Sequence, residues 1–124
     1  LNRIKELYDK AIDVKNIKLI ISKEDCLGDI KGFGDRIREF SDTNTIAVIG
    51  TIINDLPMMM CTVTKDIENQ LSAKKIISKL ASIIEGGGGG RNAIATAGGK
   101  NKDKLDKALV EAEKVIMEFV NEKK

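Results

Sequence analysis

The sequence predicts a mixed α/β (α+β) domain in which helices pack on a small mixed β-sheet and a long amphipathic helix ends the chain. Four stretches have apolar residues at helical spacing, short apolar runs rich in β-branched residues lie between them, and a turn sequence joins two of these runs. At 124 residues, of which 42% are hydrophobic and 32% charged, the chain is long enough to bury one core without disulfides or metals.

The first part of the chain is expected to contain two helices and one strand. Residues 1–14 carry apolar side chains at helical spacing, and residues 17–21 form a β-branched run that is typical of a buried strand. One apolar helical face then continues through residues 30–40, and this helix is expected to end near Ser41.

A β-hairpin is expected in the middle of the chain. Residues 45–53 are apolar on both alternating faces, which suits a central strand that is covered on both sides. Residues 54–57 have the composition of a turn, so residues 58–64 should return as the antiparallel partner. The three methionines at 58–60 are interpreted as core residues rather than a soft-metal site, because methionine beside a turn usually fills gaps in a core.

The last part of the chain is expected to contain two further helices and a short strand. Residues 71–84 have helical spacing, with Ser72 as the N-cap and Gly86 as the left-handed residue that ends the helix. Small residues at 92–97 suggest a last edge strand, and residues 105–119 define the long amphipathic C-terminal helix.

A run of five glycines followed by an arginine is the clearest functional signal in the sequence. Residues without a Cβ atom lose much backbone entropy on ordering, so a folded domain keeps Gly86–Gly90 where the main chain approaches something closely or adopts positive φ. Gly98-Gly99-Lys100 follow a few residues later. A bound ligand would explain this pattern. The alternative is that the glycines only let the third helix and the terminal segment pack tightly.

Positive charge gathers around these glycines. Residues 86–107 contain five basic and two acidic residues, whereas the rest of the chain contains 16 basic and 17 acidic residues, so the net charge of +2 arises in this window. Such an arrangement is expected where backbone N–H groups and side-chain cations share a phosphate-bearing partner. A solvated, charged helix face is the alternative.

Known cofactor and catalytic signatures do not fit the sequence. Gly99-Lys100 fails the phosphate-loop pattern because Ile94 stands where its first glycine should be, and the dinucleotide fingerprint G-x-G-x-x-G fits no register. The sequence has no histidine, and Cys26 and Cys61 are interpreted as small buried residues. No apolar run approaches the ~20 residues of a membrane span. The sequence therefore indicates a cytoplasmic, non-catalytic binding module without a cofactor of its own and without a membrane partner.

The glycine segment carries a family resemblance. Residues 86–100, followed by Lys-Leu-Asp-Lys-Ala-Leu at 104–109, closely resemble the glycine-rich end of C-Ala, the C-terminal domain of alanyl-tRNA synthetase, which belongs to the DHH-associated group. The resemblance is densest over residues 71–109 and extends by order of elements over most of the chain. The family normally has Arg-Pro-Asp after the glycines, whereas residues 91–93 are Arg-Asn-Ala. The phosphoesterase branch of the group carries a histidine in a shorter glycine motif, which this chain lacks.

The resemblance implies a tRNA-binding module of a larger enzyme. C-Ala contacts the outer corner of tRNA(Ala) and helps the upstream synthetase domains aminoacylate and edit one tRNA. Residues 1–15 would then be the end of a linker helix, which in the family contributes to a homodimer, and residues 16–124 the C-Ala domain with its glycine-rich loop 86–100. ATP with magnesium, and zinc for editing, would belong to the parent synthetase. The residues expected to contact RNA are Gly86, Gly87, Gly88, Gly89, Gly90, Arg91, Gly98, Gly99, Lys100, Lys102 and Lys104.

Recognition is expected to depend on the shape and backbone of the RNA. Phe33, Phe40 and Phe119 fit core positions of their helices, which argues against stacking of bases on aromatic side chains. Two rival functions remain: the substrate-binding domain of a DHH-type phosphoesterase that acts on nucleotides or oligonucleotides, and a dimerisation module. An upstream Asp-His-His domain would favour the first, whereas a monomeric protein that includes the upstream helix would exclude the second.

Overall fold

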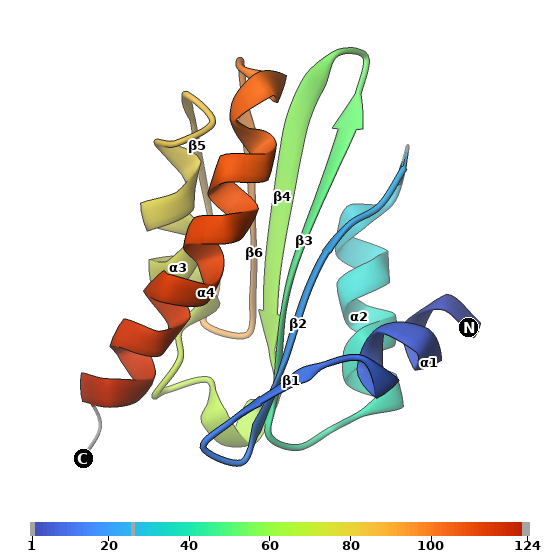
Figure 1. The fold of residues 1–124 in the computed structure, drawn as a ribbon, viewed down its shortest axis with the longest axis vertical. Helices are drawn as coiled ribbons and strands as arrows, with labels where there is room; N and C mark the ends of the chain where they lie inside the picture. The colour runs from blue at the N-terminus through green and yellow to red at the C-terminus, as the bar shows by residue number, and fades with distance from the viewer. Residues whose placement is uncertain (1, 26, 123–124) are drawn as a thin grey trace.

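Six strands form one mixed sheet in the order β1-β2-β3-β4-β6-β5 in the computed structural model, which describes residues 2–25 and 27–122 (Figure 1). The elements in chain order are α1 (Asn2–Asp9), β1 (Ile12–Val14), β2 (Ile17–Lys23), α2 (Ile30–Phe40), β3 (Thr45–Ile53), β4 (Leu56–Val63), η1 (Lys65–Ile67), α3 (Ala73–Ala81), β5 (Gly86–Gly90), β6 (Ile94–Gly99), η2 (Lys102–Lys104) and α4 (Leu105–Glu122). Strands β2 and β3 are parallel and are joined through α2, whereas the other neighbouring strands are antiparallel. The predicted mixed sheet with packed helices and a long C-terminal helix is confirmed.

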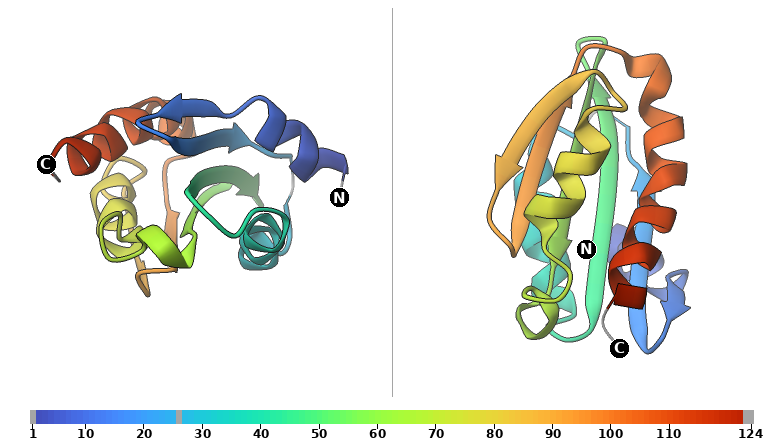
Figure 2. Two further views of the ribbon diagram at one scale, coloured as in Figure 1. Left: turned by 90° about the horizontal axis from the view of Figure 1, so that it is seen from below. Right: turned by 90° about the vertical axis from the view of Figure 1, so that its left-hand side faces the viewer.

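Helices cover the two faces of the sheet unequally (Figure 2). On one face, α4 lies against β2 and β3, while α3 lies against β4, β6 and β5. On the other face, α1 lies against β2, while α2 lies against β3, β4 and the beginning of β6. The second face is therefore left without a helix over β5 and the far end of β6.

The central strands have the predicted burial on both faces. Along β3, Ile46 and Val48 belong to the core under α3 and α4, whereas Ala47 and Ile49 belong to the core under α1 and α2. All four are fully buried, and a buried isoleucine or valine side chain contributes about 1.5–3 kcal/mol to folding. In β4, residues 59 and 60 are fully buried methionines, which confirms their interpretation as core residues.

Two tight turns differ from the sequence prediction for the same reason. Lys15-Asn16 (φ 51° and 71°) and Asn54-Asp55 (φ 54° and 65°) both have two residues of positive φ, as two-residue hairpins of type I′ require. The first turn pairs residues 12–14 with β2, so the helix predicted over 1–14 ends at Asp9. The second turn is shorter than the predicted 54–57, because β4 already begins at Leu56.

The end of the third helix also differs from the prediction. Ser72 accepts a hydrogen bond from the Lys75 N–H and caps α3 as predicted. The helix ends at Ala81, and the left-handed residue after it is Glu85 (φ 60°) rather than Gly86. Because an αL residue near the end of a helix is usually glycine, the sequence predicted Gly86 and not its neighbour Glu85 in this role. Gly86 instead begins a strand.

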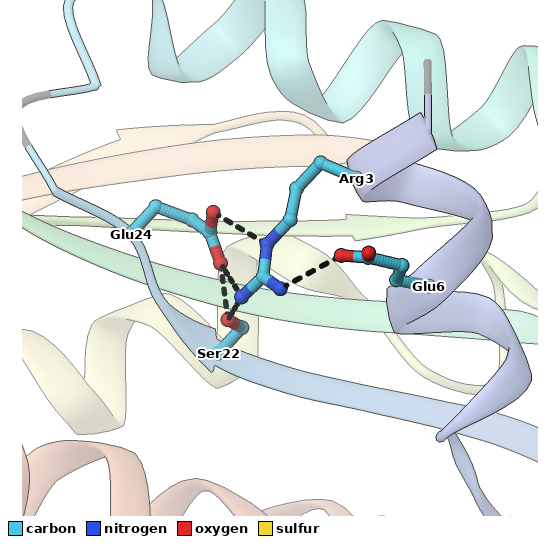
Figure 3. A network of polar contacts seen from close by, with 4 residues as sticks. All are labelled: Arg3, Glu6, Ser22 and Glu24. Atoms are coloured by element: carbon cyan, nitrogen blue, oxygen red, sulfur yellow. Dashed lines mark hydrogen bonds and ion pairs between the residues drawn. The ribbon is translucent and has the colours of Figure 1, made fainter.

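Helix α1 is fixed to the sheet by a buried face and by a polar network. Ile4 and Leu7 are buried in the core beside α2. Arg3 donates from Nε and Nη2 to the two carboxylate oxygens of Glu24, at 2.9 and 2.8 Å, and from Nη1 to Glu6 Oε1 at 3.2 Å (Figure 3). The Ser22 hydroxyl also donates to Glu24. The hydrogen bond from Arg3 lowers the pKa of the Glu24 carboxyl, and burial opposes this shift only in part.

We expect the stabilising effect of Glu24 to depend on pH. A carboxyl whose pKa is lower in the folded chain stabilises the fold above its unfolded pKa of about 4.5 and loses this effect as the pH falls through its folded pKa. Glu24→Gln should therefore lower the free energy of unfolding at pH 7 by about 0.5–1 kcal/mol, and by less at pH 3. Urea denaturation at both pH values measures this difference. Glu113→Gln, on the exposed face of α4, is the control, and an effect of Glu24→Gln that is equal at both pH values would contradict the expectation.

Candidate functional site

The glycine run is the edge strand of the sheet and not a loop. Gly86–Gly90 form β5, which pairs with β6 from Gly86 opposite Gly99 to Gly90 opposite Ala95. Strand β6 in turn pairs with β4, so the strand predicted at the edge over 92–97 lies inside the sheet. Glycine has low strand propensity and no side-chain pattern, which is why this hairpin was not predicted from the sequence.

Three of the five glycines are required by the close approach of β5 to β6. A Cβ atom at Gly86, Gly88 or Gly90 would lie 1.9, 2.2 or 2.5 Å from a main-chain oxygen of β6. Gly90 also has a φ of 154°, which side-chain-bearing residues rarely adopt. Gly99 has a similar role, because its Cβ would lie 2.2 Å from the main-chain oxygen of Ile84. Tight packing, the alternative to a ligand, therefore accounts for these four positions.

The remaining glycines have no such role and leave the main chain bare. A Cβ atom at Gly87, Gly89 or Gly98 would meet no atom within 4 Å. Gly87 lies opposite Gly98, and Gly89 lies opposite Thr96, so these four residues share one face of the sheet. This is the face of Ile94 and α2, beyond the part that α2 covers. We call Gly87, Gly89, Thr96 and Gly98 the glycine platform.

The two cations next to the glycines lie at opposite ends of the β5–β6 hairpin. Arg91 is in the turn, where its main-chain N–H donates to Ile94 O at 2.8 Å, and Lys100 follows β6, where its N–H donates to Ile84 O at 3.0 Å. Both residues are exposed. At 3.3 Å per strand residue they are roughly 20 Å apart. The structure thus separates a charge cluster that is compact in the sequence, and the two cations flank the platform instead.

The other two predicted cations occupy the turn before α4. Lys102 forms an ion pair with Asp55 of the β3–β4 turn, with 3.0 Å between Nζ and Oδ1. The hydrogen bond and charge of this carboxylate raise the pKa of Lys102. Lys104 is exposed, and in the part of the chain that the structure describes it forms no ion pair. Lys102 therefore anchors its turn to the sheet, while Lys104 is available to an anion.

The two residues that depart from the family pattern fix the β5–β6 turn to its neighbours. The Asn92 main-chain oxygen accepts from Ala73 N–H at 2.9 Å, and its Oδ1 accepts from the Ser72 hydroxyl at 2.7 Å. The Ala93 main-chain oxygen accepts from Val63 N–H at 2.9 Å. Asn92 and Ala93 thus hold the turn against the beginning of α3 and the end of β4.

A groove lined by lysines and by Phe119 is a second feature that the sequence prediction missed. Phe33 is buried as predicted, but Phe40 is 46% exposed and Phe119 is half-buried, so only one of the three phenylalanines is a full core residue. Phe119 lies beside an open groove of about 580 Å³ between α3 and α4. The groove is lined by Ser72, Lys74, Lys75, Ser78, Lys79, Asn92 and Phe119. The sequence signal for this groove was the presence of lysines at 74, 75 and 79, between the apolar positions of residues 71–84.

The described residues can be searched for metal ligands and reactive thiols. Within residues 2–25 and 27–122, no group of three or more Cys, Asp or Glu side chains gathers as metal ligands would. Cys61 is fully buried, and burial strongly raises the pKa of its thiol, so its interpretation as a small core residue is confirmed. Cys26 lies outside the described residues. Over these ranges, no helix has the length and apolar character needed to span a membrane.

The chain is similar to known proteins over most of its length. Residues 16–118 match the family model described as the DHHA1 domain. An alanine–tRNA ligase of Dehalococcoides mccartyi is 40% identical over 111 residues, which cover 84% of this chain and 12% of the ligase. The C-Ala domain of Aquifex aeolicus alanyl-tRNA synthetase has the same fold, with a TM-score of 0.77 and 24% identity over 86% of this chain and 97% of that one. A pGpG-specific phosphodiesterase from Vibrio cholerae shares the fold more distantly, with a TM-score of 0.53 and 13% identity over 97% of this chain and 39% of its own.

Neighbouring glycines should differ in their response to the same substitution. Gly88→Ala places a Cβ atom 2.2 Å from Thr96 O, so we expect the free energy of unfolding to fall by more than about 1 kcal/mol. Gly89→Ala places its Cβ in open space and should change the free energy of unfolding by less than about 1 kcal/mol in either direction. Urea denaturation followed by circular dichroism compares the two variants, and equal stabilities would show that β5 does not approach β6 as described.

Proposed function

Because the chain belongs to the DHHA1 domain family, we propose that it is the C-Ala domain of an alanine–tRNA ligase and that it binds the outer corner of tRNA(Ala). The support is the similarity to an alanine–tRNA ligase over 84% of the chain, together with the fold of the Aquifex C-Ala domain. The chain spans only 12% of that ligase. The aminoacylation and editing chemistry, with ATP, magnesium and zinc, would therefore belong to the remaining domains, which this module would help to act on one tRNA.

The glycine platform is the observation that carries this proposal. A surface of main chain on which Thr96 carries the one side chain allows the backbone or a flat base pair of a folded RNA to approach to contact distance. Gly87, Gly89 and Gly98 have open space above them although the fold does not require them to be glycine. A contact with a ligand gives these positions a reason that intramolecular packing does not supply.

Cations at the two ends of the hairpin would hold the RNA on the platform. Arg91 presents a planar guanidinium that can bind a phosphate through two hydrogen bonds, and Lys100 presents a point charge. With Lys104 as a third contact, the logarithm of the association constant should fall with the logarithm of the salt concentration at a slope of about −2 to −3. The platform offers main-chain groups rather than a set of polar side chains, so recognition by shape is expected and base sequence would be read elsewhere in the ligase.

The two rival functions have weaker support. The phosphoesterase alternative has only the shared fold of a phosphodiesterase at 13% identity. Dimerisation through the first helix would need an apolar face, but Ile4 and Leu7 of α1 are 2% and 8% exposed because they pack into the core of their own chain. Binding of tRNA therefore remains the proposed function.

The test is fluorescence anisotropy of the chain with full-length tRNA(Ala) and with an acceptor-stem minihelix that lacks the corner, each at two salt concentrations. We expect tight, salt-sensitive binding to the full tRNA only. Gly89→Leu should weaken it at least tenfold by covering the platform, and Arg91→Ala with Lys100→Ala should weaken it and make the salt slope less steep by about 2.

Gly28→Leu is the matched control for the platform variant. Gly28 lies in the segment between β2 and α2, and a Cβ atom there also meets nothing within 4 Å, so this variant should bind the tRNA as the unchanged chain does. Equal binding of both RNAs would indicate unspecific attraction of charges. Equal binding by Gly89→Leu and Gly28→Leu would exclude the platform as the contact surface.

A further inference from the structure

The groove between α3 and α4 lies on the opposite face of the sheet from the glycine platform. It is open to solvent, with a volume of about 580 Å³. One wall is the exposed side of α3, the other is Phe119 near the end of α4, and Asn92 of the β5–β6 turn closes one end. The proposed contact of tRNA with the platform leaves this groove without a role.

Positive charge in the groove is not neutralised by the protein. Lys74, Lys75 and Lys79 are exposed, and none of them has a carboxylate within ion-pair distance among the residues that the structure describes. No acidic residue lines the groove. Lys74 and Lys75 also lie in the first turn of α3, where the helix dipole adds to the positive potential. The groove is therefore complementary to an anion that carries more than one charge.

Phe119 adds a flat apolar surface to this positive wall. Its ring is half-buried, and Lys79 Nζ lies over the ring at 5.9 Å from the centroid. Because this ammonium group lies above the ring and Lys79 also lines the groove, a face of the ring, and not only an edge, looks into the groove. The lysine stem is flexible, so Lys79 can leave the ring for a nearby phosphate when a planar group takes its place.

Asn92 supplies a polar group of fixed orientation. The Ser72 oxygen accepts from the Lys75 N–H at 3.3 Å, and its single hydroxyl proton goes to Asn92 Oδ1 at 2.7 Å. With its oxygen held in this way, Asn92 keeps its Nδ2 group as a donor that no described residue accepts from. The groove thus combines cations, an aromatic face and a free amide donor.

We propose that this groove binds one unpaired nucleotide of an RNA strand, with the base stacked on Phe119 and the phosphates at Lys74, Lys75 and Lys79. The inference rests on the proposed RNA-binding function and adds a second contact to it. A flat base fits an aromatic face, phosphates fit unpaired lysines, and the amide of Asn92 can donate to a base edge. An acidic peptide would use the lysines but would leave the ring face and the amide donor without a matching group.

The test uses a fluorescently labelled pentamer of adenylate and an abasic pentamer of the same length, with binding to the 124-residue chain followed by anisotropy. Phe119→Leu should weaken binding of the adenylate pentamer by about 5- to 150-fold, the usual effect of losing one stacked base, and Phe119→Tyr should restore it. The abasic pentamer should bind the unchanged chain about as weakly as the adenylate pentamer binds Phe119→Leu. Lys74→Gln with Lys75→Gln should make the salt slope less steep by about 1.4.

Phe40→Leu is the matched control, because Phe40 is an exposed phenylalanine on the other face of the sheet. Leucine keeps an apolar side chain at both positions, and circular dichroism checks that each variant is folded. The inference is overturned if Phe119→Leu and Phe40→Leu bind the pentamer equally, if the abasic pentamer binds as tightly as the adenylate pentamer, or if polyglutamate displaces the pentamer as well as an excess of RNA does. The last outcome would indicate an acidic protein surface as the partner.

The platform variant separates this inference from the proposed function. Gly89→Leu should leave binding of the pentamer unchanged, because the platform and the groove lie on opposite faces of the sheet. Loss of tRNA binding in Gly89→Leu together with equal pentamer binding by Phe119→Leu and the unchanged chain would remove the groove and leave the proposed function standing. If Gly89→Leu still bound the tRNA while Phe119→Leu lost binding of the pentamer, the groove would be supported and the platform excluded.

Discussion

The close approach of the β5 main chain to β6 is the constraint on which the outer part of the sheet depends. Oxygens of β6 occupy the places that Cβ atoms would take at Gly86, Gly88 and Gly90. Because neighbouring residues of a strand point to opposite faces, this steric requirement leaves Gly87 and Gly89 unconstrained on the other face. One contact between two main chains thus explains Gly86, Gly88 and Gly90 and sets apart Gly87 and Gly89, which it does not explain.

The path of the chain through the β5–β6 hairpin determines which charged residues lie near one another. The sequence places Arg91 and Lys100 in one basic window, but the hairpin moves them to its two ends, and the turn instead brings Asn92 to the lysines of α3. The platform and the groove lie on opposite faces and both reach toward this turn. A strand of RNA that passes around the end of the hairpin would therefore meet main chain on one side and lysines with an aromatic ring on the other.

The sequence was informative where periodicity was long and misleading where single residues decide the path of the chain. Helix α2 and strand β3 followed their patterns, because eleven and nine residues respectively define a face without ambiguity. The first helix was predicted too long because Lys15-Asn16 form a turn with positive φ although neither residue is a glycine. For the site, the sequence identified the glycine segment. It did not show which glycines are needed for packing and which are not, because only the register with β6 shows which of them meet another main chain. The partial exposure of the Phe119 ring depends on how α4 packs beside α3, which helical spacing alone does not reveal.

The exposed edge of β5 also bears on strand pairing between copies of the chain. A free sheet edge usually carries charged side chains, a proline or a bulge that hinder pairing with another strand. Gly86–Gly90 offer none of these within the strand. Glycine limits the gain from such pairing in another way, since it contributes no cross-strand side-chain contacts. The same glycines that leave the platform face of β5 without side chains therefore also remove the side-chain contacts that a second strand would make along this edge.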